Sequence, residues 1–262
     1  MKDEIRYESK CPVVIVTGAS SGLGAAFVRL LDESLPPEIA LWLIARNEEK
    51  LCQFADGLQH EAQCFALDLT DVGSFSVISD ALRSSDGTVQ LLINNAGEGA
   101  PGSFEKQTSR YQESLCDLNV RAQVSLTSIV LPYMEEGSAI IFTSSVAAFL
   151  PQPGFATYAA SKAFILSFGR ALAEELRPRQ IGVTVTCPNP MLTDFFTPEE
   201  KEKLLRSYKR FAIEDPSYVA EKTIAAVRKR KVVVVTSFLG KLVRLLSKIL
   251  PHRWIIRLIG SA

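Results

Sequence analysis

Two side chains that can exchange a proton, Tyr158 and Lys162, stand four residues apart. On a helix, the spacing i, i+4 places both on one face. A lysine ammonium beside a phenol favours the phenolate, so we expect Lys162 to lower the pKa of Tyr158 from its ordinary value of about 10. The pattern is compatible with proton-transfer chemistry, although a Tyr and a Lys one turn apart are, by themselves, more often a surface pair.

A glycine-rich turn, Thr17-Gly-Ala-Ser-Ser-Gly-Leu-Gly, follows the short apolar run 13–17. Glycines let the backbone approach a pyrophosphate closely, and the amino end of the helix that follows stabilises its charge. The structural alternative is a tight turn whose glycines only let that helix pack closely on the strand. We expect a dinucleotide site, formed here by Gly18, Ser20, Ser21, Gly22, Leu23 and Gly24.

The same turn also matches G-x-S-x-G, the nucleophile elbow of α/β-hydrolases, through Gly18, Ser20 and Gly22. That chemistry requires an acidic residue and then a histidine later in the chain. The sequence has only two histidines, His60 and His252, and His252 lies in a basic tail beyond the last predicted strand. His60 is followed by Glu-Ala-Gln-Cys and lacks the second histidine of a zinc-protease helix. We therefore disfavour a hydrolase and expect no metal site.

Arg46 follows the second predicted strand, where an acidic residue would receive the ribose hydroxyls of NAD(H) and repel a 2′-phosphate. A guanidinium at this position is a planar, permanently charged phosphate ligand. Arg46 therefore favours NADP(H), while NAD(H) stays open, because the alternative is a solvated arginine at the start of a helix.

Strand-length apolar runs alternate with helical patterns along the chain. Such runs are typical of a parallel sheet with helices on both faces, so we predict a Rossmann-type doubly wound α/β fold of about seven strands. Helices are expected from about Leu23 to Glu33, from Tyr158 to about Leu176, and after an Asp215 N-cap with Pro216. No linker divides residues 11–236, so residues 1–236 form one predicted domain and 237–262 an extension. The predicted strands are Val13–Thr17, Ile39–Ala45, Gln63–Leu67, Leu91–Ile93, Ala139–Thr143, Val183–Cys187 and Val232–Val235.

Taken together and in order, these motifs resemble those of the short-chain dehydrogenase/reductase family, from Pro12 to Val235. Four blocks carry the resemblance. They are the glycine-rich turn, Asn94-Asn95-Ala96-Gly97, Ser145 thirteen residues before Tyr158, and Tyr158-x-x-x-Lys162.

The resemblance implies an NAD(P)-dependent oxidoreductase in which Tyr158 donates a proton to a carbonyl oxygen and Ser145 hydrogen-bonds that oxygen. It implies that Lys162 also holds the nicotinamide ribose and that Asn119, in Leu-Asn-Val, positions a water in the proton relay. Further cofactor contacts are implied for Asp68 at the adenine, Asn95 at the ribose, Thr193 at the nicotinamide amide, and for Leu69, Ala96 and Gly97.

One motif departs from the family. After the sixth predicted strand the family usually has Pro-Gly, whereas this chain has Pro188-Asn189. Asparagine tolerates a positive φ better than most residues, so we expect the turn to survive with Asn189 in that conformation. The substrate is expected to be an apolar ketone or alcohol, enclosed by side chains of the segment after Thr193. The candidates are Phe195, Phe196, Leu204, Leu205, Tyr208 and Phe211.

The formal net charge of zero conceals an uneven distribution. The chain has 29 basic and 29 acidic residues, but ten basic and no acidic ones follow Glu221, so residues 1–221 carry a net charge of −10. Such a chain is not a general nucleic-acid binder. Lys241, Arg244 and Lys248 share one face of a predicted helix in a strongly apolar segment, Phe238 to Leu250, and Arg253 to Ile259 repeats the pattern with Trp254. These segments suit an anionic membrane surface or, equally, packing on the body or a partner subunit.

We therefore predict an NADP(H)-dependent carbonyl reductase or alcohol dehydrogenase acting on a small molecule. The alternative is a non-catalytic dinucleotide-binding sensor or scaffold. The charged first ten residues lack the apolar core of a secretory signal, and the five scattered cysteines form no C-x-x-C pair. These features indicate a cytoplasmic protein, with peripheral membrane contact left open, and the family resemblance suggests a homodimer or homotetramer.

Overall fold

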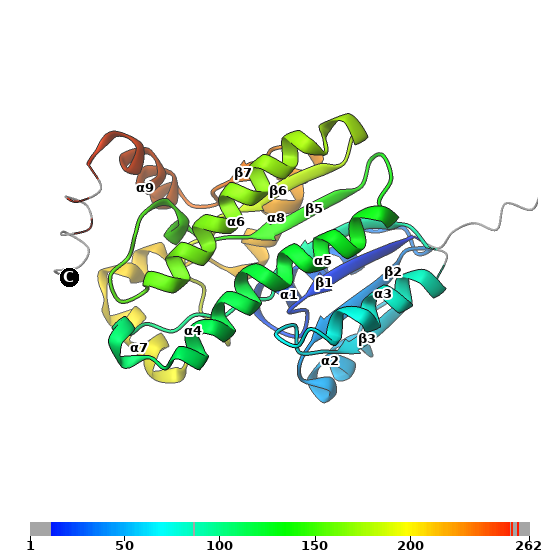
Figure 1. Ribbon diagram of the computed structural model, residues 1–262, viewed down its shortest axis with the longest axis horizontal. Helices are drawn as coiled ribbons and strands as arrows, with labels where there is room; N and C mark the ends of the chain where they lie inside the picture. Colours follow the sequence, from blue (N-terminus) through cyan, green and yellow to red (C-terminus); the bar gives the residue numbers. More distant parts are fainter. Residues whose placement is uncertain (1–11, 86, 252, 254–255, 257–262) are drawn as a thin grey trace, which may run out of the picture.

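Seven parallel strands form one sheet in the order β3-β2-β1-β4-β5-β6-β7 (Figure 1). This computed structural model describes residues 12–85, 87–251, 253 and 256. The predicted doubly wound α/β fold is confirmed. The strands are β1 (Val13–Thr17), β2 (Ala40–Ala45), β3 (Ala62–Ala66), β4 (Val89–Asn94), β5 (Ala139–Thr143), β6 (Gly182–Thr186) and β7 (Val233–Val234).

The strands lie close to their predicted positions because their apolar runs are buried from both sides. Every residue of β1 and β5 is buried, and both strands have the predicted bounds. β4 is longer than predicted, and β3 and β6 each begin one residue earlier. These ends depend on pairing with the neighbouring strand, as where Val89 pairs with Val13 before an irregularity in register.

Two apolar cores fill the space between the sheet and its helices. One lies between the sheet and the helices that precede and follow β4 and β5, while the other lies beneath the first two helices and the last domain helix (Figure 1). The first layer holds α3 (Ser74–Ser84), α4 (Ser109–Cys116), α5 (Ala122–Val130) and α6 (Ala156–Glu175), and the second holds α1 (Gly22–Asp32), α2 (Glu48–Ala55) and α8 (Pro216–Arg228).

The strand order reverses at β1, which pairs with both β2 and β4. In an open parallel sheet, the loops after the two strands on either side of such a reversal diverge and leave a crevice at the carboxyl ends. Those loops begin at Gly18 and Asn95. The topology therefore brings the glycine-rich turn and the Asn-Asn-Ala-Gly motif together.

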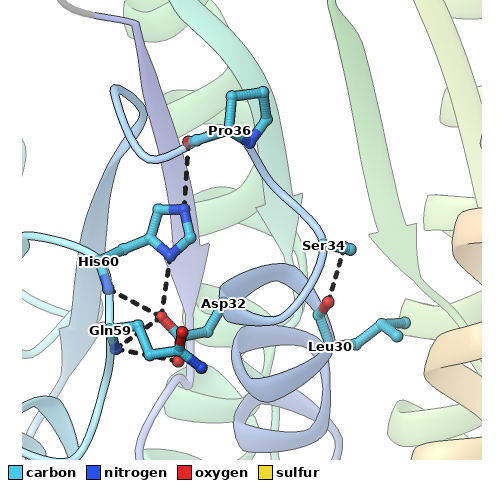
Figure 2. A network of polar contacts seen from close by, with 6 residues as sticks. All are labelled: Leu30, Asp32, Ser34, Pro36, Gln59 and His60. Atoms are coloured by element: carbon cyan, nitrogen blue, oxygen red, sulfur yellow. Dashed lines mark hydrogen bonds and ion pairs between the residues drawn. The ribbon is translucent and has the colours of Figure 1, made fainter.

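A buried polar cluster joins the end of α1 to the chain before β3 (Figure 2). The Asp32 carboxylate accepts hydrogen bonds from the backbone N–H groups of Gln59 and His60, at 2.9 Å each to Oδ1, and pairs with His60 Nδ1 at 2.9 Å. His60 Nε2 lies 3.1 Å from the Pro36 carbonyl oxygen. Both ring nitrogens of His60 thus face acceptors, which favours the doubly protonated imidazolium.

Burial raises the pKa of Asp32, but the N–H donors of His60 and Gln59 outweigh it and hold that pKa below its usual value. Burial conversely lowers the pKa of His60, and its hydrogen bonds to Asp32 and Pro36 outweigh this and raise it. His60 therefore pairs with Asp32 and connects the turn before β3 to the end of α1.

Two further helices complete the described chain, α7 (Pro198–Arg206) after β6 and α9 (Phe238–Ile249) after β7. The predicted N-cap of α8 is confirmed, since Asp215 accepts from the N–H groups of Ser217 and Tyr218. The predicted helix at 238–250 corresponds to α9. Most of the second predicted tail segment, 253–259 with Trp254, lies outside the described residues. In the part of the chain that the structure describes, no helix is long and apolar enough to span a membrane.

Candidate active site

The glycine-rich turn has backbone conformations and contacts that side chains would disrupt. Gly18 and Gly22 have φ values of 65° and 53°, the left-handed region that favours glycine. A Cβ on Gly24 would stand 2.0 Å from the Gly18 carbonyl oxygen, so α1 can approach the turn this closely only with glycine there. The turn ends at the amino end of α1, where backbone N–H groups and the helix dipole favour an anion.

Thr17 connects this turn to the loop after β4. Its hydroxyl donates to the Ile93 carbonyl at 3.2 Å and accepts from the N–H groups of Asn95 and Ala96, at 2.9 Å each. The Asn95 amide donates to the Thr17 carbonyl at 3.1 Å. The ends of β1 and β4 are thereby held together, with Ala96 and Gly97 at the mouth of the crevice.

Asn119 lies in a π-helical turn, η2 (Asp117–Arg121), between α4 and α5. Such wide turns are frequent at functional sites, because they redirect one side chain out of the regular helical pattern. Asn119 is fully buried; its Oδ1 accepts from the Glu98 N–H at 2.9 Å, and its Nδ2 donates to the Glu98 carbonyl at 2.8 Å and to Ser161 Oγ at 3.1 Å. Ser161 in turn donates to the Tyr158 carbonyl at 2.8 Å. Asn119 thus links the loop after β4 to α6.

Tyr158 and Lys162 lie one turn apart near the start of α6, as predicted. Lys162 Nζ lies 5.7 Å from the centre of the Tyr158 ring and donates to the Thr143 carbonyl at 3.0 Å. Ser145 follows β5, and its Oγ accepts from the Ala147 N–H at 3.1 Å. Ser144 points elsewhere and donates to the Lys162 carbonyl at 2.8 Å. The structure therefore brings Ser145, Tyr158 and Lys162 to one site and gives Ser144 a separate bond.

The expected effect of Lys162 on Tyr158 is corrected by the structure. Burial raises the pKa of Tyr158 to about 12, and a hydrogen bond with Ser145 only partly opposes this. Burial also lowers the pKa of Lys162 to about 8. The Lys162 ammonium faces the Thr143 carbonyl and the ring rather than pairing with the phenol oxygen, so desolvation decides the direction of the tyrosine shift. Tyr158 is consequently a protonated, neutral phenol at pH 7.

A cavity of about 1000 Å³ unites most of the predicted site residues. It runs from the amino end of α1, past the loops after β2, β4 and β5, to α6 and the segment after β6. Its lining includes Gly18, Ser20, Ser21, Gly22, Leu23, Arg46, Leu69, Asn95, Ala96, Gly97, Ser145, Tyr158, Lys162 and Thr193.

Three predicted site residues do not line this cavity. Gly24 does not face the cavity; its lack of a side chain lets α1 pack closely against Gly18. Asn119 lies behind Gly97, where an added Cβ would stand 3.0 Å from Asn119 Oδ1 and 3.1 Å from Lys162 Nζ. Asp68 is exposed, and its carboxylate accepts from the N–H and hydroxyl of Thr70 at 2.9 and 2.8 Å. The predicted contact of Asp68 with the adenine stays a prediction.

The structure adds residues that the motifs did not single out. Asn47 and Lys50, beside Arg46, line the same end of the cavity, and Asn47 Oδ1 caps α2 by accepting from the Lys50 N–H at 2.8 Å. Lys50 Nζ forms an ion pair with Asp194 at 2.7 Å, so α2 and the segment after β6 meet across the cavity. The only sequence signal for Lys50 was its place one helical turn after Arg46.

Aromatic rings close the other end of the cavity. The Tyr158 ring packs edge-on against Phe155 and Phe195, with centroids 5.3 and 5.7 Å apart, and Phe195 contacts Phe196. Phe195, Phe196 and Leu204 line the cavity as predicted, whereas Leu205 and Phe211 are exposed and do not. The side chain of Tyr208 lies outside what the structure describes.

Asn189 corrects the expectation for the turn after β6. Among the described residues other than glycine, positive φ values occur at Gln180 and Arg230, and not at Asn189. Asn189 is instead buried and anchored: its N–H donates to the Glu214 carboxylate at 2.7 Å and its amide donates to the Ser237 hydroxyl. The asparagine side chain therefore makes a connection to the N-cap of α9 that a glycine could not make, whereas the bond to Glu214 uses the backbone N–H.

These features fit a nicotinamide dinucleotide. Glycines that approach backbone closely and a helix amino end suit the pyrophosphate, and the Arg46 guanidinium beside them suits a ribose phosphate. They do not fit the hydrolase alternative. His60 is paired with Asp32 and does not line the cavity, and His252 lies outside the described residues.

The chain belongs to the short-chain dehydrogenase family, whose model matches residues 12–204. It is therefore a member of a family of NAD(P)-dependent oxidoreductases with a Rossmann fold. It is 28% identical over 186 residues to the 3-oxoacyl-(acyl-carrier-protein) reductase FabG of Thermotoga maritima, covering 70% of this chain and 75% of that protein. It is 28% identical over 253 residues to a fatty acyl-CoA reductase of Acinetobacter baylyi, covering 94% of this chain and 82% of that protein.

Two solved structures of similar fold hold different dinucleotides. A short-chain dehydrogenase from Sphingobium yanoikuyae in complex with NADPH is 25% identical, with a TM-score of 0.73 and coverage of 92% of this chain and 97% of that one. A short-chain dehydrogenase/reductase from Burkholderia phymatum in complex with NAD is also 25% identical, with a TM-score of 0.78 and coverage of 92% and 95%.

Proposed function

We propose that the chain is an NADP(H)-dependent oxidoreductase that interconverts an apolar carbonyl compound and its alcohol. The observation that carries the proposal is the position of Tyr158, a protonated phenol inside the cavity, beside Ser145 and against the rings of Phe155 and Phe195. A proton donor, a hydrogen-bonding hydroxyl and an apolar wall are what a carbonyl group on an apolar molecule needs for reduction.

When bound, the reduced dinucleotide would supply the hydride that is added to the carbonyl carbon, and the oxidised dinucleotide would accept the hydride of the alcohol in the reverse direction. The residues of this chain handle the oxygen and the proton. Ser145 hydrogen-bonds the oxygen as negative charge develops, and Tyr158 transfers its phenolic proton to it. The positive charge of Lys162, 5.7 Å from the centre of the Tyr158 ring, stabilises the phenolate that remains without a direct bond to its oxygen. Asn119, through Ser161 and Glu98, holds α6 and the loop after β4 in place. In the reverse direction Tyr158 takes the proton of the alcohol.

The preference for NADP(H) rests on charge at one end of the cavity. Arg46 and Asn47 line it directly after β2, and the positive charge of Arg46 helps to hold the pKa of Asp68 below its usual value, together with the donors of Thr70 that outweigh the effect of burial. A 2′-phosphate placed there would meet a cation rather than a carboxylate. The NADPH-bound relative supports this choice, and the NAD-bound relative keeps NAD(H) as the competing outcome.

The apolar substrate is supported from two directions. Phe195 packs against the Tyr158 ring, and Phe196, Leu204 and Met191 line the same cavity. Two relatives are named for acyl substrates, a 3-oxoacyl-(acyl-carrier-protein) reductase and a fatty acyl-CoA reductase. We therefore favour ketones, aldehydes or alcohols with an aliphatic chain.

The exposed outer face of α6 supports assembly into a homodimer or homotetramer. Phe164 is 46% exposed and stacks on Phe168, with centroids 6.1 Å apart. An aromatic residue at such a position is typical of a subunit interface. We place the protein in the cytoplasm, because its five cysteines are scattered along the sequence and form no C-x-x-C pair, as expected in a reducing compartment.

The decisive experiment follows NADPH oxidation with a series of aliphatic aldehydes and ketones of increasing chain length. We expect turnover, a kcat/KM that rises with chain length, and a loss of at least about 100-fold in Tyr158→Phe. Tyr218→Phe, at an exposed position on α8, should behave as the wild type. Tight NADPH binding with no turnover across the series would instead show a dinucleotide-binding sensor or scaffold.

A further inference from the structure

The helix α9 presents an apolar face to the surroundings. Phe238, Leu245 and Ile249 are 84%, 54% and 67% exposed, and the intervening turns add Leu239, Leu242 and Leu246. Positions i, i+1, i+4, i+7, i+8 and i+11 fall on one side of an α-helix. Together they form a continuous stripe along the whole of α9, which we call the outer face.

The other side of α9 is fixed to the body of the protein. Gly240 is buried so closely that an added Cβ would stand 2.8 Å from side-chain atoms of Val146, Val235 and Ser237. The Arg244 guanidinium lies over the Phe149 ring, 5.8 Å from its centre, in the short helix η4 (Val146–Phe149). Ser237 caps α9 by accepting from the Gly240 N–H at 2.8 Å. The orientation of α9 is therefore set by packing, and that packing turns the outer face away from the body.

The charge around the outer face is positive. Lys241 and Lys248 are exposed and lie on one flank of the apolar stripe, while Arg244 faces inward. No acidic residue occurs anywhere after Glu221, in a chain whose preceding part carries a net charge of −10. A second copy of the chain that met this face with its own α9 would offer Lys241 and Lys248 no acidic residue from that helix. An anionic surface would complement them.

The outer face continues to the mouth of the cavity. Leu239 is 41% exposed and also lines the cavity that holds Tyr158. Ser237 at the start of α9 is bonded to Asn189 in the segment after β6 that lines the same cavity. Whatever covers the outer face therefore lies against one edge of the cavity opening.

We propose that the outer face of α9, with Lys241 and Lys248, docks the protein on an anionic lipid bilayer. Apolar side chains of an interfacial helix enter the region between headgroups and acyl chains, and lysines on its flank pair with the headgroup phosphates. This surface rests on the exposure and charge of α9 and is independent of the proposed reaction. If the proposed reaction also holds, docking would place the cavity opening where an aliphatic substrate dissolved in the membrane is concentrated.

The test is co-sedimentation of the full chain with vesicles of phosphatidylglycerol mixed into phosphatidylcholine, compared with phosphatidylcholine alone. We expect binding to the anionic vesicles that exceeds binding to the neutral ones by at least about tenfold, and that weakens between about 50 mM and about 500 mM salt. The double variant L242E/L245E should lose at least about tenfold in binding, and so should K241E/K248E.

A matched control carries the same kinds of change far from α9. V72E/R83E replaces one exposed apolar and one exposed basic residue at α3 and the loop before it, at the other end of the molecule (Figure 1). It should bind vesicles as the wild type does. All three variants change exposed side chains, so we expect thermal unfolding transitions close to that of the wild type, which a melt recorded by circular dichroism would verify.

Three results would overturn the proposal. They are the absence of binding by the wild type, equal binding to neutral and anionic vesicles, and binding that the α9 variants retain. If the wild type ignored vesicles and L242E/L245E changed the molar mass in solution, the outer face would be an interface between copies of the chain. A failure of catalysis would leave each of these readouts intact, because none of them uses substrate or dinucleotide.

Discussion

Asn119 and Glu98 exchange two hydrogen bonds: Asn119 Oδ1 accepts from the Glu98 N–H at 2.9 Å, and Asn119 Nδ2 donates to the Glu98 carbonyl at 2.8 Å. A side chain from a π-helical turn thus completes the backbone pairing of a loop that has no strand beside it. The loop carries Gly97 and Gly99, where an added Cβ would stand 3.1 Å from Lys162 Nζ and 2.4 Å from Tyr158 Cδ2. The geometry at Tyr158 therefore depends on a residue that does not touch the cavity.

Replacing Asn119 should weaken both the fold and the site. Asn119→Ala leaves the partly buried N–H and carbonyl of Glu98 without their partner, so we expect a loss of about 2 kcal/mol in the free energy of unfolding and of at least about tenfold in kcat/KM. Ser114→Ala is the control, since the Ser114 hydroxyl donates to the Glu98 carboxylate, at 3.3 Å, and not to the Glu98 backbone. Denaturant titration and steady-state kinetics measure the two effects, and an Asn119→Ala protein as stable as Ser114→Ala would contradict the argument.

The buried charge of Lys162 should lower the free energy of unfolding, although the proposed reaction needs that lysine. Its pKa is lowered to about 8 by burial, so between that value and about 10.4 the unfolded chain binds more protons and stability rises with pH. Lys162→Met removes the buried charge and also removes the hydrogen bond to the Thr143 carbonyl. We expect it to be inactive yet more stable by about 2 kcal/mol below pH 8, with the difference shrinking as pH rises towards 10. Unfolding curves at a series of pH values test this, and a difference that grows with pH would refute it.

Arg46 should decide between the two dinucleotides. Arg46→Asp exchanges a cation for an anion where a 2′-phosphate would lie, so NADPH binding should weaken by at least about 100-fold and NADH binding should change little. Fluorescence titration of both nucleotides measures the ratio. Arg83→Asp, at an exposed position on α3, is the charge-matched control. Equal losses for NADPH and NADH would remove the proposed role of Arg46.

The pair of His60 and Asp32 should make stability depend on pH in a defined sense. The pKa of His60 is raised, so its contribution is complete below about pH 6.5 and is lost as pH rises through the folded-state pKa. The pKa of Asp32 is lowered, so its contribution is lost only as pH falls below about 3.8. His60→Gln should therefore cost about 1 kcal/mol near pH 5.5 and less near pH 8.5.

The same measurement on Asp32→Asn provides the control, because an amide keeps one acceptor but removes the charge that favours the imidazolium. When His60→Gln is made in the Asp32→Asn background, its cost in the free energy of unfolding should be the same near pH 5.5 and near pH 8.5. If His60→Gln cost the same free energy at both, the protonated form of His60 would not be the one that stabilises the fold.

Gly99 should tolerate no side chain. A Cβ there would stand 2.4 Å from Cδ2 and 3.0 Å from Cε2 of the Tyr158 ring. Gly99→Ala must shift that ring, and displacements of about 1 Å can cost about 100-fold in rate, so we expect such a loss in kcat/KM with NADPH binding retained. Gly57→Ala meets only the Phe54 carbonyl, at 3.7 Å, and should leave kcat/KM unchanged. A Gly99→Ala enzyme of normal activity would show that Tyr158 can be repositioned freely.

The fold class and the family follow from the order of residues along the chain. Both depend on local signals: apolar runs buried on both faces of the strands, turns that require glycine, and residues spaced for one helix face. Such signals can be recognised without knowing which segments pack against them. For this reason the predicted bounds of β1 and β5 agree with the observed ones. Strand ends such as those of β4 depend on pairing with a distant neighbour, and they were predicted less well.

The pairing of charges, the depth at which each group is buried and the direction in which a helix faces depend on how distant segments pack together. Burial reverses the expected direction of the Tyr158 pKa shift, Glu214 and Ser237 give Asn189 a conformation that its residue type did not indicate, and Lys50 meets Asp194 across 144 residues of chain. The outward turn of α9 follows from the fit of Gly240 against Val146 and Val235. These properties arise from contacts between distant segments, and the free energy of a charge or an apolar surface depends on those surroundings rather than on its neighbours in sequence.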